Sequence, residues 1–133
     1  MTTIEGKPRD DLAERVTGLP HAVARDPALL RRGRHLNTTC LLRLGDRMFL
    51  LRVVDGDIAQ LRPGPFVTPS CDFSIAGDEA VWRRLFAAEP PPGDHDLLAF
   101  VKRGELQLAG DLHPLMSHLL YWKGVLACLK EPT

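Results

Sequence analysis

The side chains that could do chemistry gather near the C-terminal end of the chain. Ser117 and His118 are adjacent, and Tyr121 follows, so that a hydroxyl, an imidazole and a phenol occur in one short stretch. Such groups serve in acid–base catalysis. His113 and His118 are five positions apart, which turns them away from each other on a helix and argues against a shared metal ion.

A second candidate is the run Asp94-His95-Asp96, in which two carboxylates flank an imidazole. Neither group is accompanied by a G-x-S-x-G elbow, an H-E-x-x-H motif or a phosphate-binding loop. We therefore interpret His95 as a capping or loop residue and His118 as a helix-surface residue. The sequence predicts no catalytic residue, no metal site and no cofactor.

Composition narrows the class of protein. The 133 residues include 17 basic and 17 acidic side chains, so no long-range field would concentrate nucleic acid or an anionic membrane. Cys40, Cys71 and Cys128 form an odd set without C-x-x-C spacing, which is typical of reduced thiols in a cytosolic protein. The polar N-terminus is unlike a secretory signal, and no apolar run is long enough to span a bilayer. We expect one cytoplasmic domain that neither binds nucleic acid nor inserts stably into a membrane.

Turn and cap residues predict two short helices at the beginning of the chain. Pro8 can sit in a first helical turn, and Gly18 ends that segment. Asp26 followed by proline is the signature of a second helix, which Gly33 closes.

Alternating apolar residues predict five strands. Gly45-Asp46 joins the first two strands and is a strong hairpin signal, and Asp55-Gly56-Asp57 turns the chain into the third. These three strands are therefore antiparallel to one another. The predicted strands are residues 38–44, 47–54, 58–62, 71–76 and 105–109.

The phrase Ala-Gly-Asp occurs twice, as Ala76-Gly77-Asp78 and as Ala109-Gly110-Asp111. Each copy follows an alternating stretch and precedes apolar residues with helical spacing. Glycine permits a sharp turn and aspartate is a favoured helix N-cap, so each copy predicts strand, turn and helix. The first helix is expected over residues 78–88.

The second of these helices is expected to be long and to close the fold. It is apolar on more than one face, so it is buried on more than one face or borders something apolar. A short helix capped by Asp94 or Asp96 and ended by Gly104 precedes it, after the prolines at 90–92 stop the helix before.

Two stretches resemble the sterol carrier protein type 2 family. They are Asp72-Phe73-Ser74-Ile75-Ala76-Gly77-Asp78, with a tryptophan four residues later, and the segment Lys102 to Leu112, which is sharpest from Gly104 onward. The resemblance covers roughly residues 36–129. It implies an α+β domain over residues 36–130, in which helices cover one face of a five-stranded, mostly antiparallel sheet. Residues 1–35 carry no motif of that family, and we expect them to pack on the domain as a helical segment.

The resemblance also implies an apolar cavity between sheet and helices for a fatty acid, a sterol, an acyl-CoA or a similar lipid. The residue pattern is compatible, although core and cavity lining need the same residue types. The expected ligand-binding residues are Phe49, Leu51, Phe66, Phe73, Ile75, Trp82, Leu85, Phe86, Leu97, Val101, Leu106, Leu108, Leu112, Met116, Leu119 and Leu120.

Three functions remain open from the sequence. The first is non-enzymatic binding, transfer or presentation of a lipid. The second is an interaction, regulatory or dimerisation domain that offers the final helix to a second copy or to an enzyme. The third is a small enzyme acting on a hydrophobic substrate, with His118 or Tyr121 near the mouth of the cavity.

Overall fold

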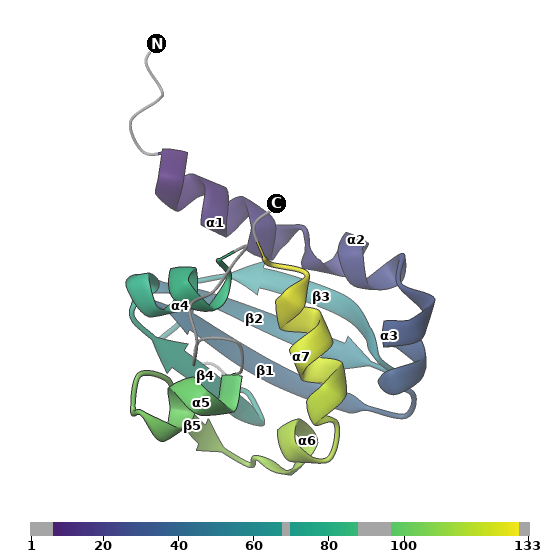
Figure 1. The fold of residues 1–133 in the computed structure, drawn as a ribbon. Coiled ribbons are helices and arrows are strands. Elements are labelled where there is room, and N and C mark those ends of the chain that lie inside the picture. Colours follow the sequence, from purple (N-terminus) through teal and green to yellow (C-terminus); the bar gives the residue numbers. More distant parts are fainter. Residues whose placement is uncertain (1–6, 68–69, 88–96, 131–133) are drawn as a thin grey trace.

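A computed structural model of the chain describes residues 7–67, 70–87 and 97–130. One five-stranded sheet has the strand order β3-β2-β1-β4-β5, and the helices lie over one of its faces (Figure 1). Three of the four strand pairs are antiparallel, and β1 and β4 form the one parallel pair. The α+β architecture with a mostly antiparallel sheet is therefore the one expected.

The first three strands form the expected meander. They are β1 (Asn37–Leu44), β2 (Arg47–Val54) and β3 (Asp57–Pro63). Gly45 adopts a positive φ of 63° in the first turn, and Asp55 and Gly56 adopt 53° and 83° in the second. Glycine and aspartate tolerate this left-handed region, and the register Leu42↔Phe49 follows from the tight first turn.

The remaining strands lie on the other side of β1. They are β4 (Phe73–Gly77), parallel to β1, and β5 (Gln107–Gly110), antiparallel to β4. Both strands start two residues later than predicted. Asp72 lies just before β4, where its carboxylate accepts hydrogen bonds from the Thr38 hydroxyl (2.7 Å) and the Thr39 amide (3.0 Å). This contact fastens the start of β4 to β1.

Three short helices precede the sheet: α1 (Lys7–Thr17), α2 (Leu19–Ala24) and α3 (Pro27–Arg32). The cap at Asp26 is confirmed, since its Oδ1 accepts from the Leu29 amide at 3.1 Å. The prediction that the first helix ends at Gly18 is confirmed, whereas α2, which begins at the next residue, was not predicted. Gly18 ends α1 but is also the N-cap residue of α2, whose first turn tolerates Pro20 because the first-turn amides lack helical partners.

The helices after β4 differ from expectation in how they begin. They are α4 (Glu79–Leu85), α5 (Leu97–Lys102), α6 (His113–Met116) and α7 (Leu119–Ala127). Asp78 stands at the N-cap of α4, but its side chain makes no capping hydrogen bond. Asp111 is not an N-cap, because α6 begins two residues later; its carboxylate accepts from the His113 amide at 3.1 Å.

Gly104 ends the turn after α5 at φ 78°, as predicted. The proposed caps Asp94 and Asp96 and the proline run lie outside the described residues.

The long final helix is two helices, which corrects the prediction. The Ser117 hydroxyl donates to the His113 carbonyl at 2.7 Å, and His118 leaves the helical region with φ −128° and ψ 41°. A serine that hydrogen-bonds the backbone four residues earlier competes with continued helix. The break lets α6 and α7 take different directions (Figure 1).

A single hydrophobic core joins both layers. It extends from Leu12 and Val16 of α1 through the covered face of the sheet to Leu126 of α7 and Leu129. No helix within the described ranges is long and apolar enough to cross a membrane.

Close approach of three elements predicts unequal effects of two glycine substitutions. A Cβ at Gly33 would lie 2.6 Å from the Tyr121 ring and 2.8 Å from the Gly56 Cα, whereas at Gly124 it would meet only the Leu29 side chain, at 2.6 Å. The Gly56 backbone cannot easily move away from a new Cβ, whereas the Leu29 side chain can change its rotamer. We expect Gly33→Ala to lower the free energy of unfolding by about 1–3 kcal/mol.

Gly124→Ala is the matched control, because alanine favours helix by about 1 kcal/mol over glycine and offsets part of the Leu29 clash. Urea denaturation of both variants measures the difference. Equal destabilisation would contradict the proposed close packing at Gly33.

Candidate functional site

Most of the predicted lining residues lie inside the protein. Phe49, Leu51, Phe73 and Ile75 project from the sheet toward the helices, and Ile75 and Leu51 have no exposed surface. The buried predicted residues are Phe49, Leu51, Phe73, Ile75, Trp82, Leu85, Phe86, Leu97 and Leu106. The half-buried ones are Phe66, Val101, Leu108, Leu112 and Leu119.

Aromatic rings fill the space between α7 and the middle of the sheet. Trp122 meets Phe73 edge to face at 5.3 Å between ring centroids, and Tyr121 meets Trp122 at 5.3 Å. Tyr121 and Trp122 are not among the predicted lining residues. The high density of apolar residues in the predicted final helix indicated burial, but it did not indicate which of its side chains face the sheet.

Three predicted residues lie elsewhere. Leu120 is 65% exposed and Met116 is 46% exposed, so the expectation that they face the sheet is wrong. The reason is the break at Ser117, which resets the helical phase between the two. Phe66 lies near Leu50 and Arg52, which project from the opposite face of the sheet, and is thus separated from the other residues of the predicted set.

An apolar pocket opens between α4, α5 and α7. It is a small, partly open pocket with a volume of about 60 Å³, and it is lined by Leu85, Leu97, Leu126, Ala127, Lys123 and Lys130. This volume is well below the roughly 300–1,000 Å³ of small-molecule sites, so a ligand could enter only if the helices around the pocket move apart. Leu85 and Leu97 belong to the predicted set; the other four lining residues were missed.

Two lysines give the pocket a positive edge. Lys123 and Lys130 are seven positions apart, which places them on one side of the C-terminal segment. The Lys130 ammonium donates to the Leu85 carbonyl at 3.2 Å, at the end of α4. Four apolar residues with two cations suit an amphiphile that has an alkyl body and an anionic head.

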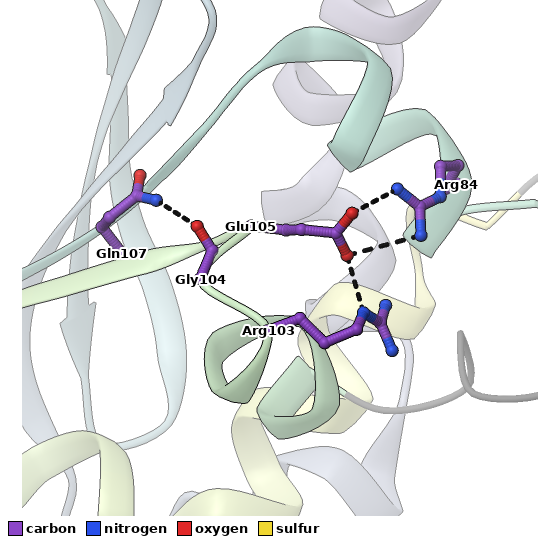
Figure 2. A network of polar contacts seen from close by, with 5 residues as sticks. All are labelled: Arg84, Arg103, Gly104, Glu105 and Gln107. Atoms are coloured by element: carbon purple, nitrogen blue, oxygen red, sulfur yellow. Dashed lines mark hydrogen bonds and ion pairs between the residues drawn. The ribbon is translucent and has the colours of Figure 1, made fainter.

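A surface network fixes the helices that supply Leu85 and Leu97. The Glu105 carboxylate accepts from Arg84 of α4 at 2.7 Å and from Arg103, just after α5, at 2.8 Å (Figure 2). Both guanidinium groups also lie over the Phe100 ring, at 5.3 Å and 4.6 Å from its centroid. Glu105 therefore links α4 to the turn that connects α5 with β5.

The same network changes the acidity of Glu105. Hydrogen bonds from Arg84, and then from Arg103, lower the pKa of the Glu105 carboxyl below its usual value. Gln107 braces the turn from the other side, donating to the Gly104 carbonyl at 2.7 Å (Figure 2).

The chemistry-bearing residues near the C-terminus do not form a catalytic set. The Tyr121 hydroxyl donates to the Gly56 carbonyl at 2.6 Å inside the protein, and burial raises the pKa of this phenol. Ser117 lies 3.1 Å from the Nδ1 of His118, but its hydroxyl also donates to the His113 carbonyl. His95 lies outside the described residues.

The three thiols are free and poorly ionised. Burial raises the pKa of Cys40, with a further contribution from Cys71. Burial first and the neighbouring Asp72 second raise the pKa of Cys71. Thiols in such surroundings are weak nucleophiles and weak metal ligands. Among the described residues, no group of three or more histidine, cysteine or acidic side chains is arranged to hold a metal ion.

A second hollow with apolar walls lies between α1 and the turn ends of β2 and β3. It has a volume of about 450 Å³ and is partly open to solvent. Its lining is Ala13, Thr17, Asp46, Arg47, Met48, Phe49, Pro63, Gly64 and Pro65. Phe49 is a predicted lining residue, and the hollow is larger than the pocket beside α7, although only Phe49 of the predicted set lines it.

Sequence comparison yields no relative: no protein-family model matches the chain, and no curated protein matches it. The architecture, in contrast, is that of a known class of α+β domain. The chain has the fold of sterol carrier protein 2, as the sequence resemblance predicted.

Three solved structures illustrate the likeness. A crystal structure of sterol carrier protein 2 superposes with a TM-score of 0.72 at 15% identity, over 90% of this chain and 96% of that one. Sterol carrier protein 2 from Yarrowia lipolytica, in its apo form, gives 0.58 at 12% identity, over 98% of both chains. A ubiquinone synthesis protein, UbiJ-SCP2, gives 0.57 at 14% identity, over 92% and 98%. Each superposition covers more of the chain than residues 36–130 contain, so it takes in part of the N-terminal helical region.

The Glu105 network predicts a pH-dependent stability difference. Because the folded-state pKa of Glu105 is lowered, its charged form stabilises the fold above the ordinary carboxyl pKa, and this contribution is lost as the pH falls through the lowered value. We expect Glu105→Gln to be less stable than wild type at neutral pH, with the difference shrinking on acidification. Urea denaturation across a pH series measures it.

Glu79→Gln serves as the control, since Glu79 pairs with Arg83 of the same helix at 2.7 Å and links no two elements. A wild-type minus Glu105→Gln difference that stays constant with pH would contradict the assignment.

Proposed function

We propose that the protein is a non-enzymatic carrier that binds a lipid or another hydrophobic small molecule in the pocket between α4, α5 and α7. The observation that carries the proposal is the lining of that pocket, which consists of the apolar side chains of Leu85, Leu97, Leu126 and Ala127 at the edge of the core, together with two lysines. The sterol carrier protein 2 fold supports it, because solved proteins of that name share the architecture.

The charges at the pocket favour a fatty acid or a similar anionic amphiphile over an uncharged sterol. An alkyl chain gains roughly 0.8 kcal/mol for each methylene that leaves water. Lys123 and Lys130 line the same pocket, within reach of a carboxylate at its mouth. An acyl-CoA also carries an anionic head, but it is much bulkier than a fatty acid and would require a larger widening of this pocket, whose volume is about 60 Å³.

The other buried residues of the predicted set form the wall behind this pocket in our proposal. Trp82 and Phe86 of that set belong to the hydrophobic core, as does Phe100 of α5, and the indole of Trp82 donates to the Arg43 carbonyl at 2.8 Å. A ligand would reach these residues by separating the helices from the sheet. The cytoplasm suits such a carrier, because its three cysteines are unpaired.

Filling the pocket should abolish ligand binding without disturbing the core. Ala127 is exposed and lines the pocket, so Ala127→Trp places a large ring in the space that an alkyl chain would occupy. We expect at least a tenfold loss of affinity for a fluorescent fatty acid, which corresponds to about 1.4 kcal/mol. Fluorescence titration measures it, and native mass spectrometry reports any copurified ligand.

Ala80→Trp is the matched control, because Ala80 is an exposed alanine of α4 that does not line the pocket. It should bind like wild type. Wild-type affinity in Ala127→Trp would exclude this pocket, and substitution of Met48 at the hollow beside α1 would then locate the ligand there. Failure of the wild type to bind any acyl chain, sterol or acyl-CoA at micromolar concentration would exclude the proposed function.

One observation favours a second function, contact with a second copy or with an enzyme through the C-terminal helices. Met116 and Leu120 are large apolar side chains with 46% and 65% of their surface exposed. Burying them in an interface would remove this surface from water. Sedimentation velocity at several concentrations tests self-association: Leu120→Glu should dissociate a dimer, and a wild type that stays monomeric throughout would leave only a different partner.

A further inference from the structure

The face of the sheet that points away from the helices carries an uneven distribution of charge. Strand register places Leu50 beside Leu41 and Arg62 in one row, and Arg52 beside Thr39 and Gln60 in the next. These rows contain two arginines and no carboxylate. The chain as a whole is neutral, with 17 basic and 17 acidic residues, so this positive region is a local feature of the fold.

A hollow lies over these rows. It has a volume of about 430 Å³ and is open to solvent, and none of its lining residues is acidic. The lining consists of Thr39, Leu50, Arg52, Gln60, Arg62, Phe66, Val67 and Ser70. Hydroxyl and amide groups thus accompany the two guanidinium groups, and all of them can donate hydrogen bonds to an anion.

The two arginines are placed to act on one anion. Arg52 and Arg62 occupy diagonal positions on neighbouring strands of the same face, about 7–8 Å apart at the backbone. Side chains of this length can converge from that separation. Two like charges at such positions repel each other, so an anion between them would relieve a cost that the free protein bears.

Local contacts orient one arginine and leave the other available. The Arg62 guanidinium lies over the Phe66 ring, 5.7 Å from its centroid, and the Gly64 amide donates to the Met48 carbonyl at 2.8 Å, which holds the chain between them against β2. Arg52 is exposed and forms no ion pair with another described residue. The nearest carboxylate in the register, that of Asp72, already accepts from Thr38 and Thr39.

We propose that this hollow is a binding site for a phosphate group, held between Arg52 and Arg62 with Thr39 and Gln60 as neutral donors. Planar guanidinium groups bind phosphate through paired hydrogen bonds, which makes arginine suited to the role. The phosphate can belong to a phospholipid headgroup or to a soluble organic phosphate. The site is on the opposite face of the sheet from the apolar pocket, so it does not depend on the proposed carrier function.

The test uses the full chain and two probes. Isothermal titration with pyrophosphate detects a soluble phosphate, and cosedimentation with phosphatidylcholine vesicles, with and without phosphatidic acid, detects a headgroup. We expect at least one probe to bind, with affinity that falls as salt rises. Arg52→Gln/Arg62→Gln should weaken that binding at least about tenfold, because two charge-assisted contacts are lost.

Arg43→Gln is the matched control, since Arg43 is exposed on the same sheet face but does not line the hollow. It should bind within about twofold of wild type if the site and not the general charge is responsible. Ala127→Trp should also bind phosphate normally, which separates this site from the apolar pocket. The proposal is overturned if wild type binds neither probe, if the double variant binds as wild type does, or if Arg43→Gln loses as much affinity.

Thermal unfolding of each variant shows whether a loss of phosphate binding results from a loss of the fold. The substituted side chains are exposed on a solvated sheet face, where changes in stability are usually small. If the double variant were unfolded, the single variant Arg52→Gln would replace it, with the same expected direction and the same controls.

Discussion

The packing of α7 across the sheet is the contact on which the rest of the structure depends. Trp122 meets Phe73 edge to face, and the hydroxyl of the adjacent Tyr121 donates to the Gly56 carbonyl. Gly33 allows this close approach because it has no side chain between the Tyr121 ring and Gly56. Edge-to-face pairs contribute about 0.5–1.5 kcal/mol beyond the burial of their area. These two rings set the distance of α7 from the sheet and the direction of its axis. They therefore also set where Leu126 and Ala127 lie relative to α4 and α5, and so where the apolar pocket opens.

The two faces of the sheet differ in polarity and charge, although the chain as a whole is neutral. The covered face is apolar and closed by helices, and the pocket at its edge adds two lysines to apolar walls. The other face carries Arg52 and Arg62 over a polar hollow. Alternation along a strand sends neighbouring residues to opposite faces, so Leu51 enters the core while Arg52 meets solvent. One strand therefore contributes both to the hydrophobic core and to the hollow that contains the two arginines.

Much of the fold could be predicted because its signals are local. Gly45-Asp46 and Asp55-Gly56-Asp57 define the two turns of the meander through their tolerance of positive φ. The Asp26 cap is likewise set by neighbours in sequence. The final helix shows where such reasoning fails. Its apolar residues predicted continuity, but a hydroxyl-to-carbonyl bond at Ser117 interrupts it and turns Leu120 outward. The candidate site was predicted less well, since Leu85 and Leu97 were named whereas Leu126, Ala127 and both lysines were not.

The sequence by itself determined which residues are apolar, where the chain turns and the order of strands and helices, because these depend on side-chain chemistry and on contacts between near neighbours. Tertiary structure decided which apolar residues are core and which border a pocket, because both need the same residue types. It also decided that Arg52 and Arg62 share a surface. Their ten positions of separation carry no such information until the turn between β2 and β3 fixes the register and brings the two side chains to one face.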